Sequence, residues 1–155
     1  MILVAGIGNV LLGDDGFGVA VVQRLRAQPL EGARAFDFGI RGLDLAYALL
    51  DPWDAAILVD ATPRGRPPGT LYVIEPNEVE PAGALSMHGA DPVAVLRSAR
   101  AMGSTVKTLR VVGCEPLTVP ADDEELSMAL SAPVAAAVQP ALELIASLVK
   151  ELADA

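Results

Sequence analysis

The stretch that most constrains the fold of this chain is Ile2–Gly18, which reads ILVAGIGNVLLGDDGFG. An apolar run over Ile2–Ala5 is followed by two closely spaced glycines, then by the adjacent carboxylates Asp14 and Asp15, and an apolar-periodic segment begins near Phe17. This order predicts a buried strand, a glycine-permitted turn and the N-terminus of a helix. In open α/β sheets, ligands bind beyond the carboxyl ends of the strands. The acidic turn is therefore the first candidate site.

Composition limits the class of protein and its partners. The 155 residues are 52% hydrophobic, which favours a single compact domain that spans residues 1–155 and has a sizeable core. The formal net charge of −9 and the lack of a Lys/Arg cluster argue against a nucleic-acid partner. The apolar runs are far shorter than the roughly 20 residues that span a bilayer, so we expect no membrane partner. The single cysteine, Cys114, cannot form an internal disulfide and no signal-peptide pattern precedes the first strand, so we expect a cytoplasmic protein.

The rest of the chain alternates predicted helices and strands. We expect helices ending by residue 28 and at 43–50, 91–102 and 130 onward, the last kinked by Pro140, and strands at 34–38, 55–59, 70–74 and 107–113. The segment between the strands at 55–59 and 70–74 is too short for a crossover helix, so the second of these strands should run antiparallel at an edge. The pattern predicts a three-layer α/β domain. Its sheet should be mostly parallel, five-stranded and twisted, with one antiparallel edge strand and helices on both faces.

Three side chains are candidates for a site in this fold. If the strands at 34–38 and 55–59 pair on opposite sides of the first strand, Asp15 and Asp60 face each other across the resulting crevice. His88, the only histidine, lies in a segment without periodicity. Two carboxylates and an imidazole suit an open site for a divalent ion such as nickel or zinc. Taken singly, each has a structural alternative: a helix cap for Asp15 and its neighbour Asp14, a turn for Asp60, and a structural role for His88.

Two other site types are disfavoured by the residues themselves. A dinucleotide-binding turn would need a third glycine where the chain has Leu11, and Asp37, placed where it could bind a ribose, is nearly as well explained by a turn. Cys114 ends an apolar strand and has no histidine near it in the sequence, so burial is favoured over a role as nucleophile.

The combined motifs resemble a known family. The segment Gly6–Gly18, the strand ending at Asp60, the loop with His88 and the segment Val112–Pro116 look like those of the nickel-iron hydrogenase maturation endopeptidases, in order over nearly the whole chain. The resemblance implies a cytoplasmic, monomeric protease of aspartyl or metal-dependent type. Its substrate would be the hydrogenase large-subunit precursor, whose short C-terminal extension it would remove once nickel is installed. It also implies that Asp15, Asp60 and His88 bind nickel and act in catalysis, with the nickel supplied by the substrate.

The chain departs from the family pattern at two places. Asp15 stands where the family often has Glu, which leaves open whether Asp14 helps. The segment Asp37–Gly42 stands where the family often has D-G-G-T-x-G, and we expect Asp37 to border the cleft.

Two alternative functions stay open from the sequence. Peptidyl-tRNA hydrolases also open with a strand and a G-x-G-N turn, but Val10 and Leu11 stand where Pro-Gly would be expected, and the acidic charge disfavours a tRNA partner. The other alternative is a non-catalytic, nickel-sensing chaperone that binds the precursor without cutting it.

Overall fold

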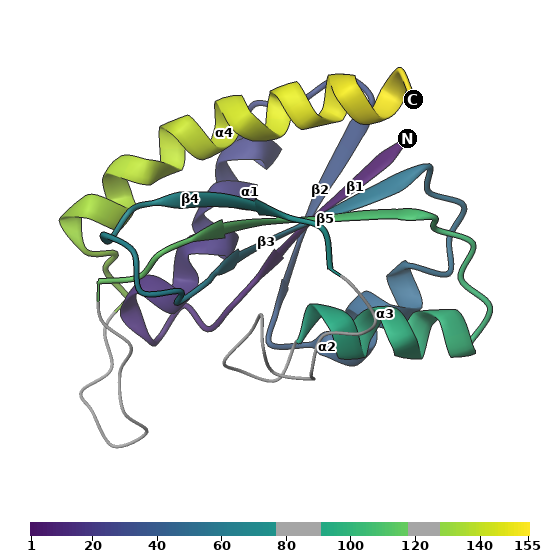
Figure 1. Ribbon diagram of the computed structural model, residues 1–155, viewed down its shortest axis with the longest axis horizontal. Helices are drawn as coiled ribbons and strands as arrows, with labels where there is room; N and C mark the ends of the chain where they lie inside the picture. The colour runs from purple at the N-terminus through teal and green to yellow at the C-terminus, as the bar shows by residue number, and fades with distance from the viewer. Residues whose placement is uncertain (77–90, 118–127) are drawn as a thin grey trace.

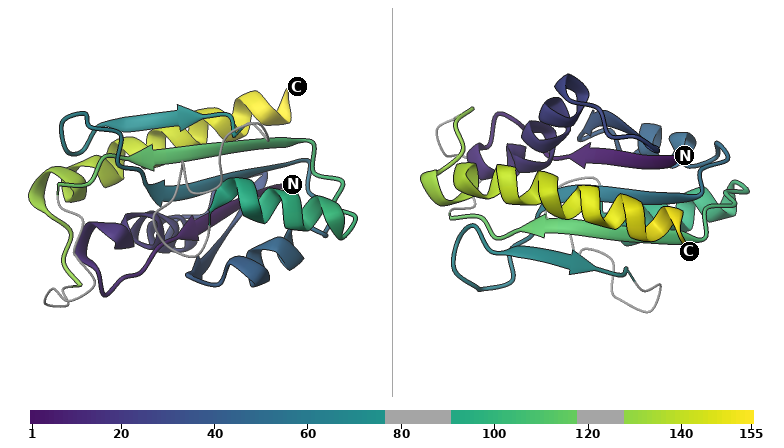
Figure 2. Two further views of the ribbon diagram at one scale, coloured as in Figure 1. Left: turned by 60° about the horizontal axis from the view of Figure 1, so that its bottom comes forward. Right: turned by 90° about the horizontal axis from the view of Figure 1, so that it is seen from above.

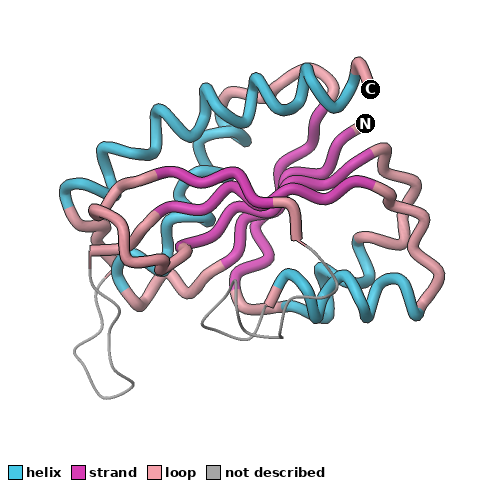
Figure 3. The backbone as a smooth tube through the Cα atoms, viewed as in Figure 1, coloured by secondary structure: helices cyan, strands magenta, loops and turns pink. Residues whose placement is uncertain are grey.

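The computed structural model describes residues 1–76, 91–117 and 128–155, which form three layers. A sheet lies between two pairs of helices, with α1 and α4 on one face and α2 and α3 on the other (Figures 1 and 3). The elements in chain order are β1 (Ile2–Ile7), the 3-10 turn η1 (Gly13–Gly16), α1 (Phe17–Ala27), β2 (Ala33–Gly39), α2 (Gly42–Ala48), β3 (Ala55–Ala61), β4 (Leu71–Ile74), α3 (Pro92–Ala101), β5 (Thr108–Cys114) and α4 (Ala132–Ala153).

The sheet has the predicted topology. Its five strands lie in the order β2-β1-β3-β5-β4, and β4 is an edge strand (Figure 2, left). The pairs β1–β2, β1–β3 and β3–β5 are parallel, whereas β4 pairs antiparallel with β5. The chain therefore adds β2 on one side of β1 and β3 on the other. The order of the strands therefore reverses at the carboxyl ends of β1 and β3, which is where a ligand-binding crevice is expected.

Two apolar cores lie on the two faces of this sheet. Ile2 and Val4 of β1 pack in the core under α1 and α4, whereas Leu3, Ala5 and Ile7 pack in the core under α2 and α3. Strand β3 alternates between the cores in the same way. Burial on both faces explains why the two central strands read as continuous apolar runs.

Helix α4 covers one face of the sheet along its length (Figure 2, right). In the described part of the chain it is the one helix long and apolar enough to cross a membrane, judged by length and composition alone. Val134, Val138, Ala141 and Ile145 of α4 belong to the core shared with α1, so packing on the sheet accounts for its apolar composition. The helix continues through Pro140.

Candidate active site

The turn after β1 is built around a glycine. Gly8 has φ +131°, and a Cβ atom there would lie 1.9 Å from the carbonyl oxygen of Asp15. Only glycine adopts this conformation and allows this approach. The next residue, Asn9, donates its backbone N–H to Oδ2 of Asp15 at 2.7 Å. The turn therefore fixes the Asp15 carboxylate, which is partly buried, beside the carboxyl end of β1.

The two adjacent acids have different surroundings. Asp14 is buried and accepts hydrogen bonds from the backbone N–H of Leu117 (2.9 Å) and from both the backbone N–H (2.7 Å) and the hydroxyl (2.8 Å) of Ser131. Ser131 is the N-cap residue of α4. Neither acid caps α1, whose N-cap residue is Gly16 and makes no side-chain capping bond. Asp14 thus joins η1 to the segment after β5 and to the start of α4. These contacts give Asp14 a structural role.

Asp14→Ala should lower the free energy of unfolding by about 3 kcal/mol, because it removes a charged acceptor from three donors at a buried position. Urea unfolding measures this loss, and Asp51→Ala, at an exposed carboxylate, is the matched control. If Asp14→Ala unfolds like the unmodified protein but loses activity, the structural assignment of Asp14 is wrong.

Asp60 lies at the end of β3, where α1 approaches the sheet. It is buried and stands opposite Gly113 of β5. A Cβ atom at Gly18 of α1 would lie 2.0 Å from the carbonyl oxygen of Val59 and 2.5 Å from that of Ile7. The first turn of α1 is therefore packed closely against the ends of β1 and β3.

This packing brings the turn that carries Asp15 against the strand that carries Asp60. Asp15 belongs to η1, which contacts β3 and leads directly into the first turn of α1. Asp60 follows Val59, the residue that this turn contacts. Carboxylate oxygens are suitable donors for a divalent ion. His88, the third predicted ligand, lies outside the described residues, and within those residues no group of three or more His, Cys, Asp or Glu side chains could hold a metal.

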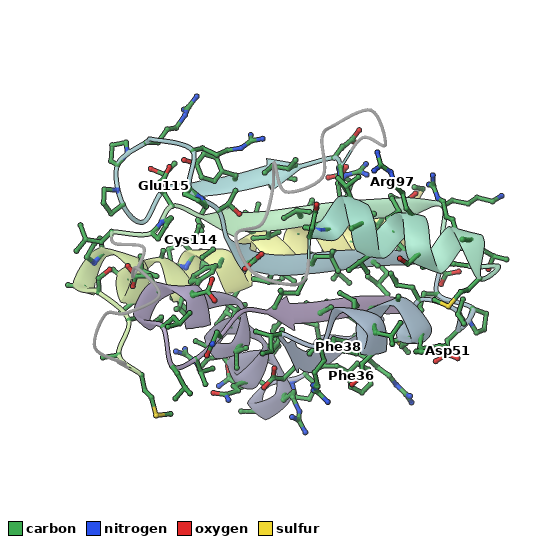
Figure 4. The ribbon with its side chains drawn as sticks, turned by 90° about the horizontal axis from the view of Figure 1, so that it is seen from below. Phe36, Phe38, Asp51, Arg97, Cys114 and Glu115 are labelled. Carbon is green, nitrogen blue, oxygen red and sulfur yellow. The ribbon has the colours of Figure 1, made fainter. Side chains whose placement is uncertain are left out.

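Cys114 is buried at the end of β5, as expected (Figure 4). Burial, reinforced by the carboxylates of Asp14 and Glu115, raises the pKa of its thiol to about 12. The thiol therefore stays protonated near neutral pH and is not a nucleophile.

Glu115 has a structural role near the end of β3 that sequence reasoning missed. Its buried carboxylate accepts hydrogen bonds from the backbone N–H groups of Arg64 (2.9 Å) and Arg66 (2.8 Å) and from the hydroxyl of Tyr72 (2.7 Å). Burial by itself raises the pKa of Glu115, but these bonds outweigh it and hold the pKa below its ordinary value. Glu115 thus fixes the loop 62–69, which leaves β3 just after Asp60.

Glu115→Gln should make the stability of the protein less dependent on pH in the acidic range. Because the pKa of Glu115 is lower in the folded than in the unfolded state, its stabilising contribution is complete above about pH 4.5 and is lost as the pH falls through the folded pKa. The melting temperature of the unmodified protein should exceed that of Glu115→Gln at pH 7, and the gap should narrow below about pH 4. A gap that is the same at pH 7 and pH 3 would show that the carboxylate charge does not hold the loop.

A pocket of about 280 Å³ opens beside Asp15, between the turn after β1 and the end of β2. Asn9, Asp37, Ile40 and Arg41 are among its lining residues. Asp37 lines this pocket, and its Oδ1 also accepts from the backbone N–H of Gly39 at 2.8 Å. The end of β2 thus forms one wall of an open depression next to the crevice.

Comparisons with known proteins identify the family of the chain. Residues 19–148 match a family model described as hydrogenase maturation protease. The chain is 37% identical over 147 residues to the hydrogenase expression/formation protein HupD of Rhizobium leguminosarum (92% of this chain, 70% of that protein). It is 35% identical to HupM of Azotobacter chroococcum (97% and 72%). The solved structure of the hydrogenase maturating endopeptidase HybD from E. coli superposes with a TM-score of 0.78 at 29% identity (97% of this chain, 92% of that chain).

The chain therefore belongs to the hydrogenase maturation protease family. It is a peptidase that processes the C-terminus of a hydrogenase large subunit during maturation. This identification confirms the resemblance seen in the sequence. It also sets aside the non-catalytic chaperone and the peptidyl-tRNA hydrolase as functions of the chain.

Proposed function

We propose that Asp15, Asp60 and His88 form the site where the chain recognises nickel in the large-subunit precursor and where the C-terminal extension is cut. The observation that supports this proposal is the close approach of α1 to the ends of β1 and β3, together with the contact of η1, which carries Asp15, with β3, which carries Asp60. The unusual tightness at Gly8 and Gly18 makes this arrangement rigid. His88 enters the proposal through the family resemblance of its loop.

The nickel in this proposal belongs to the substrate. Asp15 lies in η1, one residue before Gly16, the N-cap residue of α1, and the positive end of a helix disfavours an added cation. Weak nickel binding by the free enzyme follows, so the ion should arrive already held by the precursor. Such an ion can polarise a scissile carbonyl or activate a water. The chain contributes two fixed carboxylates: Asp15, held through the N–H of Asn9, and Asp60, held in the buried end of β3.

The proposal extends to the state and place in which the chain works. We propose a monomer in the cytoplasm, because the lone cysteine is buried and a net charge of −9 on each copy opposes self-association. Sedimentation of the purified protein at the mass of one chain supports this part. A stable dimer contradicts it.

The experiment that tests the function uses purified nickel-loaded precursor and intact-mass spectrometry. The unmodified chain should shorten the precursor by one C-terminal fragment, and Asp15→Ala should slow this reaction by about 100-fold or more, since it removes a carboxylate from the site. Asp15→Glu should retain activity because it keeps the carboxylate. Cleavage by Asp15→Ala at the unmodified rate would remove Asp15 from the site.

A further inference from the structure

Helix α2 exposes apolar side chains on its outer face. Leu43, Tyr47 and Leu50 follow one another at spacings of four and three residues, which puts them on one side of the helix and the turn that continues it. Their exposed fractions are 63%, 55% and 36%. We call these three residues the α2 stripe.

The fold does not need the α2 stripe. The opposite side of the helix already packs in the core, through Leu45, Ala46 and the following Leu49, and contacts α3. A helix whose inner side is satisfied would ordinarily carry polar residues on its outer side. Contiguous apolar residues on an exposed face instead mark a surface that another molecule covers.

The α2 stripe continues into the candidate active site. Ile40, 57% exposed, lies between the stripe and the site and lines the pocket together with Asn9, whose N–H holds Asp15. Arg41 links the end of β2 to α2: its guanidinium donates to the carbonyl oxygen of Asp37 at 2.6 Å and pairs with Asp44 of α2. Exposed residues thus connect the pocket beside the turn after β1 to the outer face of α2.

We propose that the α2 stripe is a docking surface for the folded body of the large-subunit precursor, which meets it with an apolar patch while its C-terminal extension reaches the crevice. This inference rests on the proposed function. A cut site alone offers few contacts, whereas a specific protein interface buries about 800 Å² on each partner. The continuity of the stripe with the pocket favours the molecule that is being cut. A second copy of the chain is disfavoured by the charge of −9 that each copy carries.

The flank of the sheet beside α2 supplies a further apolar surface near the stripe. Phe36 of β2 is half exposed and contacts the rings of Phe38 and Trp53, at centroid distances of 6.3 and 6.5 Å. Phe36 and Phe38 lie on the β2 side of the molecule, away from Glu115 (Figure 4). Docking on this side would leave the loop 62–69 and the β4 edge uncovered.

The double variant Leu43→Gln, Tyr47→Gln tests the docking surface, because both positions are exposed and Gln is compatible with a helix. For nickel-loaded precursor, KM should rise at least tenfold while kcat stays within about twofold. This is the result expected when a substitution weakens binding of the substrate and of the transition state equally. The matched control is Val73→Thr, Met102→Gln, which changes exposed apolar residues on β4 and after α3 and should leave KM unaltered.

Three outcomes would overturn the docking proposal or separate it from the proposed function. An unaltered KM in a folded double variant overturns it. It is also overturned if the unmodified protein is a dimer and the double variant is a monomer, because the stripe would then be a self-association surface. If the unmodified chain fails to cut the precursor, the proposed function fails. The docking proposal is then judged by binding of immobilised precursor, where tenfold weaker binding by the double variant supports it and equal binding overturns it.

Discussion

Asp60→Asn should slow processing of the nickel-loaded precursor by about 100-fold or more while the protein stays folded. The amide keeps the shape of the carboxylate, so the packing of β3 against β5 and α1 is retained. It loses the negative charge that the proposed site presents to the substrate's nickel. The measurement is the initial rate of precursor shortening at fixed enzyme concentration, with the melting temperature recorded beside it.

The control for Asp60→Asn is the same change at Asp51, an exposed residue that lies before the N-terminal end of β3, whereas Asp60 lies near its C-terminal end. Asp51→Asn should process precursor at the unmodified rate. Two results contradict the assignment of Asp60. Full activity of Asp60→Asn shows that the charge is not used, and loss of fold together with activity shows that Asp60 is a structural residue.

Gly18→Ala should strongly destabilise the folded chain. The new Cβ atom would lie 2.0 Å from the carbonyl oxygen of Val59 and 2.5 Å from that of Ile7, so α1 must move away from both strands. Overpacking of this kind destabilises by about 3 kcal/mol or more. For a domain of this size, that loss corresponds to a fall in melting temperature of about 6 to 12 °C.

A graded comparison makes the Gly18 result specific. Gly16→Ala adds the same methyl group at a less crowded position. The nearest neighbour of the new Cβ atom would be the Cα atom of Val10 at 3.1 Å, so a shift of a few tenths of an ångström suffices. Gly16→Ala should therefore be clearly milder than Gly18→Ala. Equal melting temperatures for the two variants would contradict the close approach of α1 to the strand ends, and with it the crevice on which the site depends.

The parts of the fold that were predictable are those with local signals. The strands at 2–7 and 55–61 read as apolar runs because both of their faces are buried. The short connection before β4 was enough to make it an antiparallel edge strand. Helix α3 begins as predicted, with Pro92 in its first turn and the carboxylate of Asp91 accepting from the N–H of Val93 at 3.0 Å.

The roles that the sequence did not reveal depend on partners far along the chain. Asp14 binds groups 103 and 117 residues away, and Glu115 binds the backbone of Arg66, 49 residues away. No periodicity or spacing near Asp14 or Glu115 encodes such pairs. The acids after β1 were also expected to precede a helix directly, whereas they lie in the separate 3-10 turn η1, which gives Asp15 its contact with Asn9.

The central claim is that Asp15 and Asp60 act on nickel that the precursor already holds. The most direct test incubates the purified chain with matched nickel-loaded and nickel-free precursors, after metal analysis of the chain alone. The account predicts little metal in the free chain, shortening of the nickel-loaded precursor, and no shortening of the nickel-free form. Equal cleavage of both precursors in the presence of a chelator would contradict it and would place an ordinary peptidase site elsewhere on this fold.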